Sequence, residues 1–389
     1  MKKVYMDYGA TTPVDPEVIT AMNPYFFEIY GNPSSTHSYG VDAADDIEQS
    51  RLKVASLINA KPEEIIFTSG GTEADNLAIK GIAALHENKK NTKGPHIITT
   101  EIEHAAVLET CKYLEKTGFD VAYLPVDKYG LIKTEDLKNT ISKNTFLLSI
   151  IYANNEIGTI QEIEEIGKIT ESNGILFHTD AVQAVGKIPV DVNRSRIDLL
   201  SLSSHKIYGP KGVGGLFVKK GIKIKPLFHG GGHEQGKRSS TLNTPGIIGL
   251  GKACELGKKR LVTDSKKMIK QRDTLIKNIL GIEESYLNGH PNKRLPNNAH
   301  FRFSAVEGES LHMMLDNKQI AVATGSACSS KKLKPSHVLL ALGLTPEESH
   351  GSLRFTLGRQ TEDTEISYVS KELPKIVEHL RKMSPLWKK

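Results

Sequence analysis

The sequence predicts an α/β protein whose mostly parallel sheet is flanked by helices. Short apolar, β-branched runs alternate with stretches of helical pattern, and this alternation is typical of βαβ units. The chain of 389 residues exceeds the size at which a single core stops growing, so we expect two domains. Seven runs are interpreted as strands, at residues 64–68, 96–100, 121–125, 146–152, 175–179, 199–203 and 214–218.

The last two strands of this series should pair antiparallel. Too few residues separate 199–203 from 214–218 for a crossover helix, which a parallel pair would need. The expected sheet is therefore mostly parallel, with this pair antiparallel.

The pattern changes at about residue 260, where a long charged helical stretch leads into an α+β second domain. Within it, Thr345 is predicted to cap a helix, with proline at the first helical position and Glu348 completing a capping box. We place a large domain at 15–260 and a small domain at 1–14 plus 261–389. The small domain is expected to hold strands at 298–303 and 352–357, and helices at 309–316 and 363–382.

Composition excludes several function classes. The net charge of +6 is spread along the chain rather than gathered in one arm, so direct nucleic-acid binding is not expected. No apolar run approaches the ~18 residues of a membrane span, and the first residues lack the apolar core of a signal peptide. Cys111, Cys254 and Cys328 show no CxxC spacing, so neither a disulfide framework nor a metal cluster is indicated. We expect a cytoplasmic protein with free thiols and no membrane partner.

Polar residues follow the predicted strands, at the edge where ligands of open α/β sheets collect. The segment 69–73, Ser-Gly-Gly-Thr-Glu, opens a helix after the first strand, and its backbone N–H groups and the Thr72 hydroxyl suit a phosphate. Taken alone, this segment is more often an ordinary glycine turn. The other polar residues at strand ends are His104, Asn155, Asp180, Gln183, His205 and Lys206.

Lys206 is the residue of greatest interest in this set. A lysine becomes a nucleophile when packing holds it still and a neighbouring cation lowers its pKa, and His205 could be that cation. Asp180 and Gln183 share a face if a helix begins at Asp180. Each residue alone could be structural, but their placement at consecutive strand ends favours one site. Pyridoxal phosphate needs a lysine for its aldehyde and an acid at its ring nitrogen, and Lys206 and Asp180 supply both.

Cys328 is the second reactive feature. It lies in a loop at about 324–336, among small polar residues and shortly before three lysines, and exposure with positive potential favours the thiolate. The alternative is an unremarkable exposed cysteine. By contrast, Cys111 and Cys254 fall within predicted helices and are expected to be inert.

Ten motifs in order resemble those of the cysteine desulfurases of the NifS/IscS type, in the class V aminotransferase group of fold-type I pyridoxal-phosphate enzymes. The resemblance spans nearly the whole chain. It is carried by MDYGATTPVDP near the start, GNPSSTHSYG (31–40), SGGTEADN (69–76), EHAAV (103–107), NNEIGTIQ (154–161), HTDAVQAVGK (178–187), SSHKIYGPKGVG (203–214), GGGHEQGKRSSTLN (230–243), TGSACSS (324–330) and LRFTLGR (353–359).

The resemblance implies a role for each site residue. Lys206 would form the Schiff base, Asp180 would pair with the pyridine nitrogen, and His104 would stack on the ring. The remaining cofactor contacts would be Gln183 at the ring hydroxyl, Asn155, and Gly71, Thr72, Ser203 and His205 around the phosphate. Asn155 and Arg354 would bind the substrate carboxylate. Thr241 would bind the phosphate of the partner subunit, which implies a homodimer with shared active sites.

The implied reaction removes sulfur from L-cysteine. Cysteine displaces Lys206, which then takes the Cα proton, and the Cys328 thiolate attacks the substrate sulfur, leaving a persulfide and alanine. The sulfur would pass to iron–sulfur cluster assembly, through a scaffold, or to another thiolation pathway. No resident metal is implied, although Cys328 could hold an iron–sulfur cluster transiently.

Three departures from the family pattern stand out. His233 replaces the usual glutamine and Ser240 the usual glycine before Thr241. The chain ends at Trp387 and two lysines, without the longer tail that relatives use to dock a scaffold. The competing interpretations are a selenocysteine lyase, another class V aminotransferase or lyase in which Cys328 is incidental, and a noncatalytic sulfur-relay protein.

Overall fold

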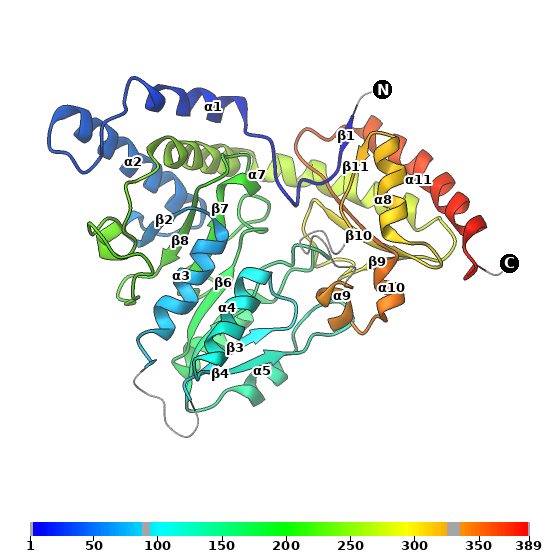
Figure 1. Cartoon of the computed structure of the whole chain (residues 1–389), viewed down its shortest axis with the longest axis horizontal. Coiled ribbons are helices and arrows are strands. Elements are labelled where there is room, and N and C mark those ends of the chain that lie inside the picture. Colours follow the sequence, from blue (N-terminus) through cyan, green and yellow to red (C-terminus); the bar gives the residue numbers. More distant parts are fainter. Residues whose placement is uncertain (1–2, 88–93, 325–334, 388–389) are drawn as a thin grey trace.

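The computed structural model describes residues 3–87, 94–324 and 335–387, and these form two groups of elements (Figure 1). The larger group surrounds a seven-stranded sheet and the smaller group surrounds a three-stranded sheet. Helix α7, Thr244–Ile279, runs from one group to the other. Both chain ends lie on the side of the smaller sheet.

The seven-stranded sheet has the order β2-β8-β7-β6-β5-β3-β4. Strand β8 is antiparallel to both of its neighbours, and the other pairs are parallel. This confirms the predicted parallel sheet and its antiparallel pair, in which Leu199 lies opposite Val218. The strands are β2 Ile65–Thr68, β3 His96–Thr100, β4 Asp120–Leu124, β5 Thr145–Ser149, β6 Leu176–Asp180, β7 Leu199–Ser203 and β8 Gly214–Val218.

Helices cover both faces of this sheet. Because side chains alternate across a strand, Ile65 and Phe67 enter one apolar core while Ile66 enters the other. The same alternation separates Leu199 from Leu200. The helices of the larger group are α1 Pro16–Met22, α2 Ser38–Leu57, α3 Gly71–Ala83, α4 Ala105–Lys116, α5 Thr134–Thr140 and α6 Ile163–Asn173.

One local prediction near the sheet edge was wrong. Strand β5 ends at Ser149 rather than at residue 152, although Tyr152 still donates a backbone hydrogen bond to Asp180. The residues after Asp180 form successive turns rather than a helix. The first of these turns is closed by a hydrogen bond from the Ala184 N–H to the Ala181 carbonyl.

The smaller group combines the start of the chain with its last third. Val4 and Met6 share an apolar core with Phe301, Phe355 and Val369. The predicted capping box is confirmed: the Thr345 hydroxyl accepts from the Glu348 N–H at 3.2 Å, and the Glu348 carboxylate accepts from the Thr345 N–H at 2.9 Å. The elements are β1 Val4–Tyr5, β9 Ser285–Asn288, β10 Asn298–Phe303, α8 Gly308–Asn317, β11 Ile320–Ala321, α9 His337–Ala341, α10 Pro346–His350, β12 Ser352–Thr356 and α11 Asp363–Met383.

The predicted elements of this region are present, and three short strands add to them. Strand β10 pairs antiparallel with β9 and β12, whereas β1 pairs parallel with β11. Strands of two residues, such as β1 and β11, carry too little periodicity to be recognised in a sequence. Among the described residues, no helix is long and apolar enough to cross a membrane.

Candidate active site

A cavity of about 380 Å³ opens where the parallel strands end. Its walls come from the residues that follow β2, β3, β5, β6 and β7, together with the segment after β1 and one side chain of β12. It is lined by Asp7, Gly9, Ala10, Gly71, Thr72, Asp75, His104, Ile151, Asn155, Asp180, Val182, Gln183, Ser203, His205, Lys206 and Arg354.

Every predicted site residue lines this cavity except Thr241 and Cys328. Thr241 is exposed and does not belong to the lining. Cys328 lies outside the described residues, so its predicted exposure and reactivity remain predictions. The structure therefore brings together residues that the sequence separates by almost the whole length of the chain.

Lys206 is positioned by the short 3₁₀ helix η4, Ser204–Lys206, directly after β7. Its Nζ donates hydrogen bonds to the carbonyl oxygens of Gly9 and Ala10, both at 2.7 Å. These two acceptors fix the end of a flexible side chain, and they come from the N-terminal segment rather than from the sheet. A lysine held in this way is oriented toward a ligand in the cavity.

His205 does not act as the cation that the sequence suggested. Burial, reinforced by the nearby positive charge of Lys206, lowers its pKa to about 4, so the imidazole is neutral near pH 7. Its Nδ1 lies 3.1 Å from the Thr11 hydroxyl. The ring therefore offers a hydrogen bond rather than a charge.

The N-terminus of α3 faces the cavity without a capping side chain at Gly70. Gly71 is required by packing, because a Cβ atom there would lie 2.8 Å from Val182 Cγ2. Thr72, in the first turn, and Ser203 add hydroxyl groups to the same lining. Free N–H groups, the positive end of the helix dipole and hydroxyl groups together suit a phosphate.

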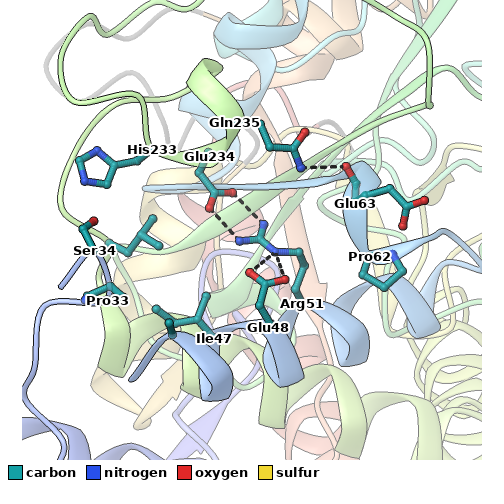
Figure 2. A pocket seen from close by; sticks show the side chains of 12 residues that line it. Pro33, Ser34, Ile47, Glu48, Arg51, Pro62, Glu63, His233, Glu234 and Gln235 are labelled. Atoms are coloured by element: carbon teal, nitrogen blue, oxygen red, sulfur yellow. Dashed lines mark hydrogen bonds and ion pairs between the residues drawn. The ribbon is translucent and has the colours of Figure 1, made fainter. Parts of the chain in front are cut away.

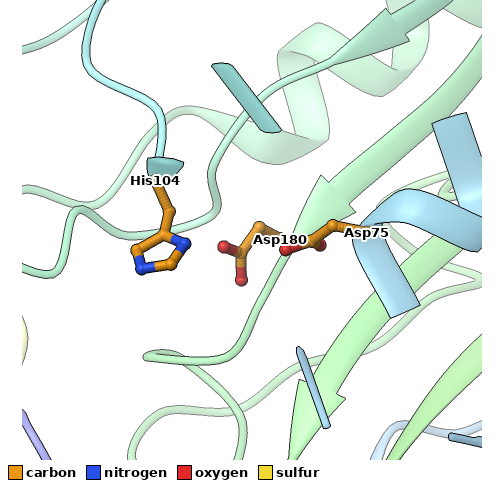
Figure 3. A group of neighbouring side chains, drawn as sticks. All are labelled: Asp75, His104 and Asp180. Carbon is orange, nitrogen blue, oxygen red and sulfur yellow. The ribbon is translucent and has the colours of Figure 1, made fainter. Parts of the chain in front are cut away.

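Asp180 and His104 lie next to each other at this edge (Figure 3). Burial raises the pKa of Asp180, while His104, the Val182 N–H and Lys206 act in the opposite direction. The Val182 N–H donates to Asp180 Oδ1 at 2.9 Å. His104 caps α4, and its Nδ1 accepts from the Ala106 N–H at 3.1 Å, so a neutral ring carries its proton on Nε2.

The opposite wall holds the arginine expected to bind a carboxylate. Arg354 is 6% exposed, and its Nη1 donates to the Asn155 carbonyl at 2.9 Å. Its Nη2 donates to Asp7 Oδ1 at 2.8 Å. Gln183 is held nearby through a hydrogen bond from its Nε2 to the Gly9 carbonyl at 2.9 Å.

The sequence interpretation missed two acids of the cavity, Asp7 and Asp75. Asp7 lies in the first quoted motif, and its place beside a short strand was a signal that could have marked it as a candidate site residue. Asp75 interrupts an otherwise apolar face of α3 that includes Ala74 and Leu77, and it is 1% exposed. A buried acid of this kind is a signal for function, because charged groups are rarely buried without a purpose.

A larger cavity, of about 530 Å³, lies elsewhere and holds none of these residues (Figure 2). Three of its charged side chains are paired with one another: Arg51 bonds Glu234 through two contacts of 2.8 Å and Glu48 at 3.0 Å. Glu234 also accepts from the Phe67 N–H at 2.7 Å, which ties this segment to β2. We therefore assign the chemistry to the smaller cavity, where unlike groups converge.

The two described cysteines are free thiols, and both are fully buried. Burial raises the pKa of Cys111 to about 12 and raises that of Cys254 further. Neither thiol is available as a thiolate near neutral pH, as the sequence predicted.

Comparison with known proteins gives a consistent result. The family model for class V aminotransferases matches residues 4–369. The chain is 52% identical over 385 residues to "Cysteine desulfurase IscS" of Methanosarcina thermophila, covering 99% of this chain and 94% of the relative. It is 53% identical over 389 residues to the protein of the same name from Clostridium botulinum, covering 99% and 97%.

Solved structures agree with these relatives. A "NifS-like protein" superposes with a TM-score of 0.91 at 39% identity, over 97% of this chain and all of its own. "SspA in complex with cysteine" superposes with a TM-score of 0.82 at 37% identity, over 93% of this chain and all of its own.

Proposed function

The chain belongs to the class V aminotransferases and is a cysteine desulfurase of the IscS type, and from this premise we propose how its residues share the reaction. The observation that carries the assignment is the convergence of the predicted residues on one cavity. The substrate of this enzyme is L-cysteine, and cysteine is also the ligand named for the similar SspA structure.

The lining of the cavity fits pyridoxal phosphate, on which this family depends. The uncapped start of α3, with Gly71 and Thr72, would hold the phosphate together with Ser203 and His205. At the other end of the cavity Asp180 would face the ring nitrogen. His104 would lie against the ring, with Gln183 and Asn155 at its edge. The donor set matches the cofactor because the lining combines N–H groups and hydroxyls, which suit a phosphate, with a carboxylate, which suits a protonated ring nitrogen.

Lys206 has two tasks in this arrangement. Its Nζ would hold the aldehyde of the cofactor, and with substrate bound the same amine would accept the Cα proton of L-cysteine. The bound cofactor supplies an electron sink for the charge left at Cα. The carbonyls of Gly9 and Ala10 can hold the lysine in its protonated form, because each accepts one N–H.

Arg354 and Asn155 orient the substrate by its carboxylate, and the sulfur leaves toward Cys328. The thiolate of Cys328 attacks the substrate Sγ, the Cβ–Sγ bond breaks, and its electron pair stays with the carbon and is neutralised by a proton. The products are alanine and a persulfide on Cys328. Reaction with cysteine thus conserves all atoms: one sulfur moves from substrate to enzyme.

The central test is mass spectrometry of the peptide that carries Cys328 after incubation with L-cysteine. We expect one added sulfur atom on Cys328 and an equal amount of alanine. Cys328→Ser should abolish both while retaining the cofactor, whereas Cys254→Ala, a matched change at a buried thiol, should retain both. Sulfide and alanine production that survives in Cys328→Ser would refute this division of labour.

We further propose a homodimer in which Thr241 completes the phosphate site of the partner. Thr241 is exposed and lies outside the cavity of its own chain, and exposed aromatic residues such as Phe26, Phe27 and Tyr30 provide apolar surface for a second copy.

A complementation experiment tests the shared site. Lys206→Ala and Thr241→Ala should each be strongly impaired as homodimers. In a mixed dimer, one cavity regains both wild-type residues, so activity should return when the two proteins are refolded or coexpressed together. If both residues serve the same chain, mixing restores nothing.

We also infer the wider organisation. Residues 15–260 form the cofactor-binding domain, and 1–14 with 261–389 form the small domain. The shared core of Val4, Phe301 and Phe355 supports this division. The persulfide sulfur would go to iron–sulfur cluster assembly or another thiolation pathway, through an acceptor protein. The free thiols of Cys111 and Cys254 suit the reducing cytoplasm.

A further inference from the structure

A second buried carboxyl group lies beside Asp180. Asp75 projects from α3, and its carboxylate, that of Asp180 and the ring of His104 offer atoms that all lie within 4.8 Å of one another. Figure 3 shows Asp180 between His104 and Asp75. Two carboxyl groups this close in a buried setting repel each other when both are ionised, so one of them retains a proton.

The surroundings decide which of the two carboxyls is ionised. Asp180 lies beside His104 and Lys206 and accepts the Val182 N–H, and all three lower its pKa and so favour its charged form. It will also face the ring nitrogen of the cofactor. The groups that favour a negative charge therefore act on Asp180.

The charged form of Asp75 is not stabilised in this way. The acidic groups that act on it, Asp180 and Glu103, both raise its pKa in addition to burial, and only a hydrogen bond with Ser201 opposes them. Its Oδ1 lies 3.7 Å from His178 Nε2 and has no hydrogen-bond partner among the described residues.

His178 cannot supply the missing positive charge. The ring lies on β6 between the hydroxyls of Ser149, at 2.8 Å, and Ser201, at 3.0 Å, and it is fully buried. Burial lowers its pKa to about 3. The imidazole is therefore neutral, so the neighbours of Asp75 on β6 and β7 other than Asp180, which are His178 and Ser201, are polar but uncharged.

We propose that Asp75 is a positioning residue that works as a neutral carboxylic acid, so that Asp180 alone carries the negative charge that faces the cofactor. This inference rests on the proposed role of Asp180. A proton on Asp75 removes the repulsion that would otherwise favour protonation of Asp180. An unionised Asp180 could no longer hold a proton on the ring nitrogen, so the electron sink would weaken.

The sharpest test compares the same substitution at the two acids. Asp75→Asn replaces a neutral acid by a neutral amide of the same shape, so its loss of kcat/KM should be at least about tenfold smaller than that of Asp180→Asn. Asp180→Asn removes the required charge and should lower kcat/KM more than about a hundredfold. With ¹⁵N-labelled cofactor, the ring nitrogen should be protonated in the parent and in Asp75→Asn but unprotonated in Asp180→Asn.

Infrared spectroscopy of the parent holoenzyme gives an independent readout that needs no variant to fold. With ¹³C-labelled aspartate, an isotope-shifted carbonyl stretch of an unionised aspartic acid should be present at neutral pH, and Asp75→Asn should remove it. Absence of that band in the parent, or equal damage from the two substitutions, would overturn the inference.

Two further outcomes separate the possible failures. If Zn²⁺ alone binds the cofactor-free protein stoichiometrically and Asp75→Asn abolishes this binding, Asp75 is an ionised metal ligand and the inference fails. If Asp180→Asn keeps a protonated ring nitrogen, the proposed role of Asp180 fails, even where the infrared band of Asp75 is present.

Discussion

Burial sets the charge of several side chains around the cavity. Glu103 is fully buried, and its Oε1 accepts from the Thr100 hydroxyl at 2.7 Å and the Ile151 N–H at 2.8 Å. Burial still raises its pKa to about 8. Lys187 shows the converse, because burial and then the charge of Lys206 lower its pKa to about 7. Glu103 and Lys187 therefore both titrate close to neutral pH.

Glu103 should make the protein less stable as the pH rises. Its pKa is 4.5 in the unfolded reference and about 8 in the fold, so the folded state binds the extra proton between these values. Its contribution to stability is fully present below pH 4.5 and is lost as the pH rises through about 8. Glu103→Gln keeps the acceptor oxygen without the titration, so its free energy of unfolding should fall less between pH 5 and 8. Identical pH dependences in denaturant titrations would contradict this.

Arg354 should control substrate affinity more than turnover. Lysine retains the charge but cannot reach both the Asn155 carbonyl and Asp7, so Arg354→Lys would present a single mobile ammonium to the substrate carboxylate. We expect KM for L-cysteine to rise about tenfold or more, with a smaller change in kcat. Arg302→Lys is the matched control, because Arg302 bonds Asn288 and does not line the cavity. A fall in kcat alone would argue against carboxylate binding.

At the scale of elements, helix ends connect local sequence to the position of the site. Gly71 lets the start of α3 approach Val182, and the Nδ1 of His104 caps α4 while its ring faces the cavity. These ends hold polar groups at the sheet edge without burying unpaired backbone N–H groups. Gly71 and His104 are therefore positioned by the ends of helices rather than by their interiors.

The capping box of α10 should make a measurable contribution to stability. Thr345→Ala removes the acceptor for the Glu348 N–H, so we expect the free energy of unfolding to fall by about 1 kcal/mol. Thr274→Ala is the matched control, since the Thr274 hydroxyl only donates to the Lys270 carbonyl of its own helix. Urea titrations would reveal the difference, and equal effects of the two substitutions would exclude a capping contribution.

At the scale of the whole molecule, Arg359 joins the two groups of elements. Its Nη1 lies 2.7 Å from Asp15 Oδ2, its Nε lies 3.3 Å from Asp264, and its guanidinium packs 3.9 Å above the ring of Tyr208. The backbone N–H of Arg359 also donates to the Tyr208 hydroxyl at 2.8 Å. Tyr208 follows Lys206 by two residues, so this contact links the segment after β12 to the segment that carries Lys206.

Loss of Arg359 should destabilise the protein far more than loss of an exposed ion pair. Arg359→Met leaves the buried Asp15 with less compensation, and we expect a loss of about 3 kcal/mol. Arg194→Met breaks an exposed pair with Glu164 and should cost less than about 1 kcal/mol. Guanidinium unfolding of both variants measures the contrast, and similar midpoints would show that the Arg359 contacts contribute little.

The elements of the fold follow largely from local sequence. The strand predicted at 175–179, observed at Leu176–Asp180, and the helix starting at Pro346 were predicted from periodicity and capping residues, which act over a few neighbouring positions. Most residues of the site were predicted as well, since residues at the carboxyl ends of parallel strands meet at one edge. Very short strands such as β1 and β11 escaped because their pairing joins distant segments.

The charges and the final composition of the site depend on packing between distant parts of the chain. Asp7 meets Arg354 across 347 positions, and no local pattern encodes that contact. His205 looked like a cation beside Lys206 but is neutral, and Asp75 looked like one more helix residue but lies in the cavity wall. Residue types and periodicity are written in the sequence and suffice for the elements, whereas the reaction class follows from the resemblance of the ten motifs to cysteine desulfurases. Protonation depends on burial and on neighbouring charge, and both exist only once the segments have packed together.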